Sequence, residues 1–306
     1  MSIIITDSFK YCPELPGRTL VNFKSIKKIE NDLNVIAAVC TRGMANHILK
    51  HNFPNLKFIQ LFSAGYDGID LNIVKNKGIT LCNAANIYNI GMSEFVVYAM
   101  LMRAKRYHKS IKNHRIRPLR NYQYITELCG KTAGIMGCGN IGNEIAKRLS
   151  AFDMKVIGYD SIIDRKTNFE NIFGLTEISE FVSKCDYLIN CLPLMPSTTN
   201  LLNNKLFRLM KDNVTFVNVG RKQIINDKDF IKFLKTHPDA TAILDMFEMV
   251  PNPITNPYRR LNNVLVLPGV TAISQEISER LKVLILDNVN RMREGLTLQC
   301  VISNPV

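Results

Sequence analysis

The stretch Lys131-Thr-Ala-Gly-Ile-Met-Gly-Cys-Gly-Asn-Ile-Gly142 decides the fold. It contains three glycines in the spacing G-x-G-x-x-G: Gly137, Gly139 and Gly142. An apolar run, residues 133–136, precedes them. A stripe with helical period follows, made of Ile141, Ile145, Leu149 and Phe152. Because an apolar strand, a glycine turn and an amphipathic helix stand in this order, the stretch predicts a unit that binds a dinucleotide.

Each glycine has a separate physical role in such a unit. Gly137 permits the tight turn from strand to helix, Gly139 lets the backbone approach a pyrophosphate, and Gly142 lets the helix pack closely on the strand. The N–H groups at the helix start, around Asn140 and Ile141, would face the diphosphate.

An acidic residue completes the pattern. The apolar run Val156-Ile157 leads to Asp160, which lies 18 residues after Gly142. A carboxylate at this place can accept hydrogen bonds from both ribose hydroxyls and would repel a 2′-phosphate. We therefore expect NAD as the cofactor rather than NADP.

Length and composition indicate a globular protein of two domains. The chain has 306 residues, of which 46% are hydrophobic and 21% charged, and it has no apolar run of the roughly 18 residues that span a membrane. Residues 1–7 have a buried-strand pattern without the basic flank of a signal peptide. The eight cysteines form no C-x-x-C pair. They are typical of reduced core thiols and favour a cytoplasmic location.

The formal net charge of +13 raises the question of an anionic partner. Eight basic residues and no acid fall between Arg103 and Arg120. This segment is either a nucleic-acid patch or a solvated helix face and arm, and an anionic substrate is a third reading. Few aromatic residues interleave with the basic ones, and no nucleic-acid motif is present. We expect no nucleic-acid partner and no membrane association.

The rest of the chain alternates between strand and helix patterns. Predicted strands cover residues 2–5, 35–40, 56–62, 79–81, 187–192, 214–219, 241–244 and 264–267. Predicted helices cover 93–106, with Ser93 as its N-cap, and 203–209, 227–234 and 275–293. This alternation predicts an α/β protein with parallel sheets. Residues just past the strand ends should line the ligand crevice; these are Pro193, Gly220, Arg221, Asp245, Pro268 and Gly269.

Over nearly its whole length the chain resembles the D-isomer-specific 2-hydroxyacid dehydrogenase family, which includes phosphoglycerate dehydrogenase and glyoxylate/hydroxypyruvate reductase. The likeness runs through Ser63-Ala-Gly-Tyr-Asp-Gly-Ile-Asp70, residues 130–160, Leu192-Pro-Leu-Met-Pro-Ser-Thr-Thr199, Asn218-Val-Gly-Arg221, Leu244-Asp-Met-Phe247 and Leu267-Pro268. The resemblance implies two Rossmann-like domains with a cleft between them. A flavodoxin-like substrate domain would comprise residues 1–99 and 275–306. A doubly wound, parallel-sheet NAD-binding domain would comprise 100–274. It also implies a homodimer through the cofactor domains.

The resemblance also assigns roles to single residues. Backbone N–H groups of Ser63, Ala64 and Gly65 would hold the substrate carboxylate, and Arg42 would lie near a second substrate-facing loop. Arg221 would hold the carboxyl and carbonyl oxygens of a small 2-oxo or 2-hydroxy acid. The cofactor contacts would include Pro193 and Thr198 on the adenine side, Val219, and Asp245 at the nicotinamide carboxamide.

Two residues of the family's chemistry do not match. A histidine normally moves the hydroxyl proton, and a glutamate paired with it raises its pKa. Here Gly269 stands at the histidine position and Val250 at the glutamate position. The two substitutions are consistent with each other, because a buried glutamate without its histidine partner would be an unpaired charge. The candidate replacements are Tyr66, Lys222, Glu248, or a water beside the small Gly269.

Three functions remain open at this point. The first is an NAD-dependent oxidoreductase for a small 2-oxo or 2-hydroxy acid with an altered proton donor. The second is a catalytically impaired NAD-binding regulatory or sensor protein, and the third is an enzyme of different chemistry on the same fold. The retained Arg221 favours the first, since an arginine at the hydride site has little use in a pure binding module.

Overall fold

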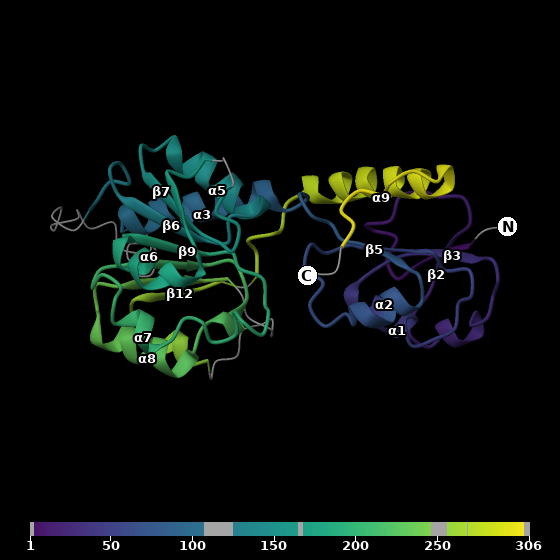
Figure 1. Ribbon diagram of the computed structural model, residues 1–306, viewed down its shortest axis with the longest axis horizontal. Helices are drawn as coiled ribbons and strands as arrows, with labels where there is room; N and C mark the ends of the chain where they lie inside the picture. The colour runs from purple at the N-terminus through teal and green to yellow at the C-terminus, as the bar shows by residue number, and fades with distance from the viewer. Residues whose placement is uncertain (1–2, 107–124, 165–167, 246–255, 268, 303–306) are drawn as a thin grey trace, which may run out of the picture. The chain divides into compact units, whose positions relative to one another are not determined.

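The computed structural model describes residues 3–106, 125–164, 168–245, 256–267 and 269–302, and it divides into two compact units (Figure 1). Unit 1 comprises Met1–Tyr88 and Ile273–Val306, and unit 2 comprises Asn89–Ala272. The units divide between Tyr88 and Asn89, whereas the sequence predicts a boundary between residues 99 and 100. Helix α3 (Asn89–Ala104) packs on helix α5 (Asn140–Ser150), so all of α3 belongs to unit 2.

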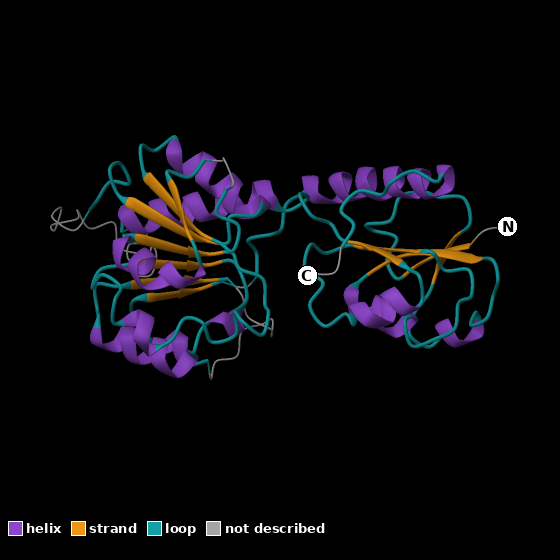
Figure 2. Ribbon diagram, viewed as in Figure 1, coloured by secondary structure: helices purple, strands orange, loops and turns teal. Residues whose placement is uncertain are grey.

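The sheet of unit 2 has seven parallel strands in the order β12-β11-β10-β9-β6-β7-β8 (Figure 2). The strands are β6 (Thr132–Met136), β7 (Lys155–Tyr159), β8 (Asn171–Phe173), β9 (Tyr187–Asn190), β10 (Thr215–Asn218), β11 (Thr241–Leu244) and β12 (Val264–Val266). From β6 the chain runs through β7 to β8 at one edge of the sheet. It then returns to β9, on the other side of β6, and runs through β10 and β11 to β12 at the opposite edge. This is the doubly wound arrangement, whose ligand crevice lies at the carboxyl ends of the strands where the winding reverses.

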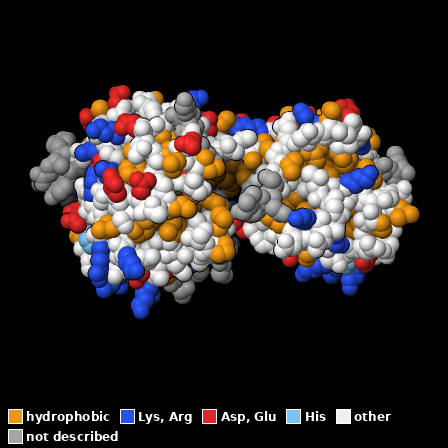
Figure 3. Space-filling model, viewed as in Figure 1, with side chains coloured by type: hydrophobic (Ala, Val, Ile, Leu, Met, Phe, Trp, Pro, Cys, Tyr) orange, Lys and Arg blue, Asp and Glu red, His pale blue; other side chains and the backbone are white. Residues whose placement is uncertain are grey.

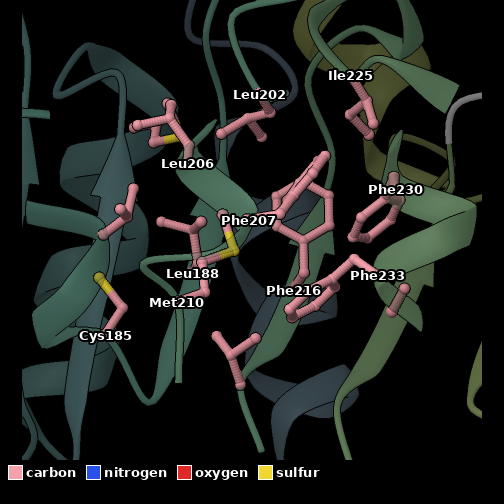
Figure 4. Close-up of a cluster of buried hydrophobic side chains, with 14 of the residues drawn as sticks. Cys185, Leu188, Leu202, Leu206, Phe207, Met210, Phe216, Ile225, Phe230 and Phe233 are labelled. Atoms are coloured by element: carbon pink, nitrogen blue, oxygen red, sulfur yellow. The ribbon is translucent and has the colours of Figure 1, made fainter. Parts of the chain in front are cut away.

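Helices cover both faces of this sheet. Helices α3 and α5 lie on one face, and α7 (Asn204–Phe207) and α8 (Asp227–Thr236) on the other (Figure 1). Helix α6 (Ile178–Lys184) and the 3₁₀ segments η3 (Leu175–Glu177), η4 (Lys222–Ile224) and η5 (Pro257–Arg260) complete the unit. A cluster of buried aromatic rings joins α7 and α8 to the sheet (Figure 4), with Phe207 and Phe230 stacked at 5.0 Å between ring centroids. Apolar packing on both faces explains why the inner strands β9, β10 and β11 are buried at every residue.

The sheet of unit 1 has five parallel strands in the flavodoxin-like order β2-β1-β3-β4-β5. The strands are β1 (Ile3–Thr6), β2 (Arg18–Leu20), β3 (Val35–Cys40), β4 (Phe58–Leu61) and β5 (Thr80–Cys82). Helices α1 (Arg42–Ile48) and α2 (Leu71–Asn76) cover one face together with η1 (Ile26–Lys28), and α9 (Glu276–Glu294) covers the other. Strand β3 shows why both covers are needed, since Ala38 packs on the α1 side and Val39 on the α9 side.

Helix α3 begins one turn earlier than predicted. The helix starts at Asn89, and Ser93 is fully buried inside it. The hydroxyl of Ser93 donates to the carbonyl oxygen of Ile90 at 2.8 Å, so it does not cap the helix. A serine inside a helix can donate its hydroxyl to a backbone carbonyl of the preceding turn. The sequence pattern alone does not distinguish such a serine from an N-cap.

The basic segment is not uniformly solvated. Arg103 donates from Nε to the Thr241 hydroxyl at 2.5 Å and from Nη2 to the Asp239 carbonyl at 3.0 Å. Burial lowers the pKa of Arg103. Residues 107–120 of this segment lie outside the described residues. Lysine and arginine side chains also stand on the surface over α7 and α8 (Figure 3), among them Lys205, Arg208, Lys228, Lys232 and Lys235.

In the described part of the chain, no helix combines the length and the apolar character needed to cross a membrane.

Candidate functional site

The glycine turn between β6 and α5 needs its glycines for three different reasons. Gly137 has a φ of +92°, a conformation that side chains disfavour. A Cβ at Gly142 would lie 2.0 Å from the carbonyl oxygen of Gly137, so the helix could not approach the turn. Gly139 is the N-cap residue and supplies no capping side chain. The N–H groups of Asn140 and Ile141 consequently have no acceptor among the residues that the structure describes.

Asp160 lies at the end of β7, beside this turn. Its Oδ2 accepts from the Cys138 N–H at 2.7 Å, and its Oδ1 accepts from the Ile162 N–H at 3.1 Å. The carboxylate and the glycine turn are therefore held together as the sequence predicted for a dinucleotide site. An uncapped helix start and an acid at the next strand fit a diphosphate and a ribose diol.

Cys138 fits in the turn because β7 carries a glycine opposite it. A Cβ at Gly158 would lie 2.4 Å from the Cys138 sulfur. The thiol of Cys138 is buried, and burial also raises the pKa of the neighbouring Cys191 thiol. Both thiols thus serve as apolar packing under the turn.

A buried amide pair, which the sequence reading missed, joins the ends of β9 and β10. Asn190 Nδ2 donates to Asn218 Oδ1 at 2.9 Å, and Asn218 Oδ1 also accepts from the Gly220 N–H at 3.1 Å. Both side chains are almost fully buried. The sequence signal was an asparagine near the end of each of two apolar runs, one to three residues before a predicted site residue.

These asparagines place the predicted residues that follow each strand. After β9, Thr198 accepts from the Met195 N–H and donates to the Pro193 carbonyl, both at 2.8 Å, which closes the loop 193–198. After β10, Val219 is buried and donates its N–H to the Asn190 carbonyl at 3.2 Å. All three lie at the carboxyl ends of β9, which is next to β6, and of its neighbour β10.

Arg221 follows directly, at the start of η4, and is partly buried. Its Nη1 donates to the Gly220 carbonyl at 3.4 Å. The adjacent Lys222 has a different environment, because its ammonium group pairs with Asp227 at 3.1 Å. Asp227 also accepts from the Tyr258 hydroxyl at 2.7 Å, so a buried tyrosine fixes the carboxylate that holds Lys222.

Asp245, at the end of β11, organises the turn that follows β12. Its carboxylate accepts from the N–H groups of Gly269, Val270 and Thr271 at 3.0, 3.1 and 2.7 Å. Burial raises the pKa of Asp245, and the three N–H groups oppose that rise. The family resemblance implies that Asp245 is a cofactor ligand. The structure shows both of its oxygens already engaged with this turn by three donors, which leaves a lone pair for about one further donor.

The positions of the missing histidine and glutamate are only partly described. Gly269 has a φ of +74°. Val250 and the candidate replacement Glu248 lie outside the described residues, as does Pro268. The three described histidines have other partners. His47 contacts the Phe23 carbonyl, His51 pairs with Glu30, and His237 stacks on Phe233. His237 is thus partly covered by the Phe233 ring.

In unit 1, the loop after β4 presents backbone N–H groups. All three of its carbonyl groups accept hydrogen bonds: Ser63 from the Ala84 N–H at 3.0 Å, Ala64 from Asn83 Nδ2 at 2.7 Å, and Gly65 from the Ser63 hydroxyl at 2.7 Å. Within the described ranges, the N–H groups of Ser63, Ala64 and Gly65 donate to nothing. Consecutive free N–H groups form a concave site for an anion.

Arg42 lies beside the same loop. Its Nη1 pairs with Asp67 at 3.0 Å, and 43% of its side chain is exposed. The preceding Thr41 caps α1, and Asp7 accepts from the Thr41 backbone at 3.0 Å. The structure therefore brings together Arg42 and the loop Ser63–Gly65 in unit 1. In unit 2 it brings together the glycine turn, Asp160 and the residues after β9, β10 and β11.

Comparisons with known proteins agree with this arrangement. A family model described as the NAD binding domain of D-isomer specific 2-hydroxyacid dehydrogenases matches residues 95–270. A glyoxylate reductase of Thermofilum pendens is 31% identical over 251 residues, covering 79% of this chain and 73% of that protein. A D-3-phosphoglycerate dehydrogenase of Archaeoglobus fulgidus is 28% identical over 252 residues, covering 82% of this chain and 48% of that protein. The chain thus spans about half the length of the phosphoglycerate dehydrogenases it matches.

Solved structures show the same fold. A D-isomer specific 2-hydroxyacid dehydrogenase family protein of Aeromonas salmonicida has a TM-score of 0.81 at 24% identity and covers 99% of each chain. The D-mandelate dehydrogenase of Rhodotorula graminis has a TM-score of 0.84 at 17% identity, covering 100% of this chain and 98% of that one. The predicted fold class and the nicotinamide cofactor are confirmed. The chain belongs to the D-isomer specific 2-hydroxyacid dehydrogenase family.

Proposed function

We propose that this protein is an NAD-dependent oxidoreductase that transfers a hydride between NAD(H) and a small 2-oxo or 2-hydroxy acid, with a proton donor different from the family's histidine. One observation carries the proposal. The loop Ser63–Gly65 has every carbonyl engaged and three N–H groups available, in a chain that also has a dinucleotide turn. Relatives named glyoxylate reductase and D-3-phosphoglycerate dehydrogenase support a small acid as substrate.

The cofactor in this proposal is NAD. The N–H groups of Asn140 and Ile141 would hold the diphosphate, and Asp160 would accept from the ribose hydroxyls. A 2′-phosphate would meet the Asp160 carboxylate, which disfavours NADP. When bound, the nicotinamide ring supplies or accepts the hydride.

The substrate would be held by its carboxylate. Backbone N–H groups in a nest bind a carboxylate without needing a charged side chain. The guanidinium group of Arg221 would hold the carbonyl oxygen and polarise it, because a planar pair of donors matches a carboxyl and its neighbouring oxygen.

The altered proton donor is not Lys222 in this proposal. Its ammonium group already pairs with Asp227, which the Tyr258 hydroxyl holds in place. Tyr66 directly follows the carboxylate loop, although its ring packs against the apolar cluster under α1 and α2. Among the candidates that involve described residues, the remaining one is a water held beside Gly269, which has no side chain to occupy that place.

A regulatory NAD-binding protein is the alternative function. The observation in its favour is the turn at Gly269, Val270 and Thr271, whose side chains include no titratable group and whose N–H groups all bind Asp245. General acid–base catalysis typically contributes about 10²–10⁴-fold to a rate, so its loss would leave binding intact and turnover slow.

Two further properties belong to the same proposal. A homodimer through unit 2 is supported by helix α3, which exposes the apolar side chains Ile90 and Tyr98. A cytoplasmic location is supported by the eight cysteines, which form no disulfide among the described residues and of which five are buried.

The test is a calorimetric titration of NADH into the protein, followed by glyoxylate, pyruvate, hydroxypyruvate and phosphohydroxypyruvate while NADH absorbance is recorded. Oxidation of NADH by any of these acids would establish the enzyme. Tight NADH binding without turnover, even at high protein concentration, would favour the regulatory alternative. Absence of NADH binding would refute both.

A pair of neighbouring variants sharpens this test. Arg221→Gln should abolish turnover and leave NADH affinity within about twofold, because the arginine acts on the acid. Lys222→Ala should retain turnover, because that ammonium group is engaged elsewhere. Equal losses in the two variants would contradict the assigned role of Arg221.

A further inference from the structure

We infer that Asn83 is a positioning residue that holds the carboxylate loop in its anion-binding conformation, and that buried amides of β4 and α9 hold Asn83 in turn. The inference rests on the proposed function for its catalytic consequence. Its structural basis lies entirely within unit 1.

The side chain of Asn83 links the loop to the next strand. Its Nδ2 donates to the Ala64 carbonyl at 2.7 Å, and its Oδ1 accepts from the Ala85 N–H at 3.1 Å. The adjacent Ala84 N–H donates to the Ser63 carbonyl at 3.0 Å. The turn after β5 therefore binds two consecutive carbonyl groups of the loop from one side. Their peptide planes are fixed so that the N–H groups of the loop point elsewhere.

This geometry decides whether the loop can bind an anion. A peptide whose carbonyl oxygen turned toward the site would present a negative dipole to the carboxylate and withdraw an N–H group. The Asn83 amide holds the Ala64 peptide against such a rotation. The hydroxyl of Ser63 donates to the Gly65 carbonyl at 2.7 Å and so holds the next peptide from within the loop.

The backbone of Asn83 is fixed on two further sides. Its carbonyl oxygen accepts from Gln60 Nε2 at 2.9 Å, and its N–H donates to the Cys300 carbonyl at 3.1 Å. Gln60 lies on β4, is fully buried, and also donates to the Leu61 carbonyl at 3.0 Å. Thus the same glutamine ties the strand that precedes the loop to the residue that holds the loop.

Helix α9 completes the chain of amides. Asn288 is fully buried and donates from Nδ2 to Gln60 Oε1 at 2.8 Å and to the Gln299 carbonyl at 3.0 Å. Its Oδ1 accepts from the Gln299 N–H at 2.7 Å. Asn288 therefore fixes both Gln60 and the segment that carries Cys300. A fully satisfied network of this kind holds its members in one arrangement.

A merely structural role for Asn83 would predict lower stability and nothing specific to the acid. The positioning role predicts a change in how the loop binds a carboxylate. Asn83→Asp is the sharpest variant, because it keeps the size and the acceptor for Ala85 and removes the donor to Ala64. Asn83→Ala removes both.

Asn46 provides a matched control. Its Nδ2 donates to the Gly68 carbonyl at 2.9 Å, so Asn46→Ala also removes an amide-to-carbonyl bond to the segment 63–68. That bond lies beyond the three N–H groups of the anion site. We expect Asn46→Ala to leave the KM for the acid unchanged.

The experiment compares wild type, Asn83→Asp, Asn83→Ala and Asn46→Ala by steady-state reduction of glyoxylate and by ¹⁵N relaxation of Ala64 and Gly65. We expect the KM for glyoxylate to rise about tenfold in both Asn83 variants, the loss typical of one hydrogen bond to a charged group. The Kd for NADH should not change. The order parameters of Ala64 and Gly65 should fall from the value of rigid backbone, about 0.85, toward that of flexible backbone, about 0.6.

The two readouts separate the inference from the proposed function. If wild type neither binds nor reduces glyoxylate, the function with that substrate fails, and the order parameters still decide the role of Asn83. If the Asn83 variants keep rigid Ala64 and Gly65 amides, or if Asn46→Ala raises the KM equally, Asn83 is not the residue that positions the loop.

Discussion

The carboxylate of Asp245 accepts a hydrogen bond of 2.7 Å from the backbone N–H of Thr271, and both residues are buried. Gly269 and Val270 donate to the same carboxylate. Asp245 thus shapes the turn in which the family resemblance places a catalytic histidine. Within the described residues, the Thr271 hydroxyl is the one buried side-chain polar atom without a hydrogen-bond partner, so this turn is satisfied through its backbone alone.

Replacing Asp245 should destabilise unit 2. Asp245→Ala would leave three N–H groups without an acceptor, and we expect the free energy of unfolding to fall by about 2–3 kcal/mol. Asp245→Asn keeps one acceptor oxygen and should lose less. Urea denaturation measures both. If both variants unfold like wild type, the turn does not depend on this carboxylate.

Restoring a histidine at position 269 should cost stability. Gly269 has a φ of +74°, and a side chain with a Cβ pays about 1–2 kcal/mol in this region. We therefore expect Gly269→His to lower the free energy of unfolding by that amount. Gly269→Asn should lose less, since asparagine tolerates this conformation. Thermal unfolding of the two variants checks the order. A histidine variant as stable as wild type would indicate that the turn rearranges.

Gly142→Ala should weaken cofactor binding. The added Cβ would lie 2.0 Å from the Gly137 carbonyl oxygen, so helix α5 would be displaced from the turn. We expect NADH to bind about 10–100-fold more weakly. Gly134→Ala is the control, because its Cβ would lie 2.2 Å from the Cys185 sulfur, in the core under β6. Both changes should lower Tm, but only the first should weaken NADH binding in calorimetry below Tm. Equal NADH affinities would argue against the turn as the diphosphate site.

Asp160→Asn should change the choice of cofactor. The amide keeps the size of the side chain and removes the charge that would repel a 2′-phosphate. We expect NADH to bind about tenfold more weakly and NADPH to bind more tightly than in wild type. Asp153→Asn makes the same chemical change at the opposite end of β7 and should alter neither affinity. A parallel loss for both cofactors at Asp160 would mean that the residue supports the turn and does not select the ribose.

The pair of Asp186 and Lys211 should make stability depend on pH. Burial alone would raise the pKa of Asp186, but Lys211 at 2.7 Å and the Thr132 N–H outweigh it and hold that pKa below its usual value. A lowered folded-state pKa gives stability that is present above the unfolded pKa, about 3.9, and is lost as pH falls through the folded pKa.

Lys211→Met should therefore flatten the fall in unfolding free energy between about pH 5 and pH 2. Because 38% of the Lys211 side chain is exposed, we expect an effect of only about 0.5–1 kcal/mol. Lys184→Met is the control, since the pair of Lys184 and Glu180 is more exposed and should contribute less. Urea unfolding at stepped pH measures both slopes. Identical slopes would mean that solvent screens the Asp186 pair completely.

Much of the fold follows from local pattern. Strands β3 and β11 begin and end where their apolar runs predict, because runs of six and four residues are too short for a helix and of the usual length of a buried strand. The edge strands β2 and β8 were not predicted. Each has three residues, and β2 exposes Thr19 and Leu20, so neither carries a strong apolar signal. Edge strands owe their conformation to the neighbour they pair with, which a local window does not contain.

In the candidate site, too, local features could be predicted and contacts between distant segments could not. The glycine turn and Asp160 could be predicted, because the spacing of glycines within one strand and helix is a local property. The partners of Asn83, Asn190 and Asn218 come from segments far apart in the chain, and no spacing relates them. The engagement of Asp245 with the turn after β12 was hidden for the same reason.

The discontinuity of unit 1 has a consequence for how the protein is made. The ribosome completes all of unit 2 between the strands of unit 1 and the helix that covers them. Until α9 emerges, the face that holds Ile4, Val39 and Phe58 has no cover, for a time on the order of ten seconds or more at ordinary rates of synthesis. Unit 2 can reach its native state during this interval. We therefore expect chaperones to bind the N-terminal segment of unit 1 during this interval, and a ribosome stalled before residue 276 would leave that apolar face exposed.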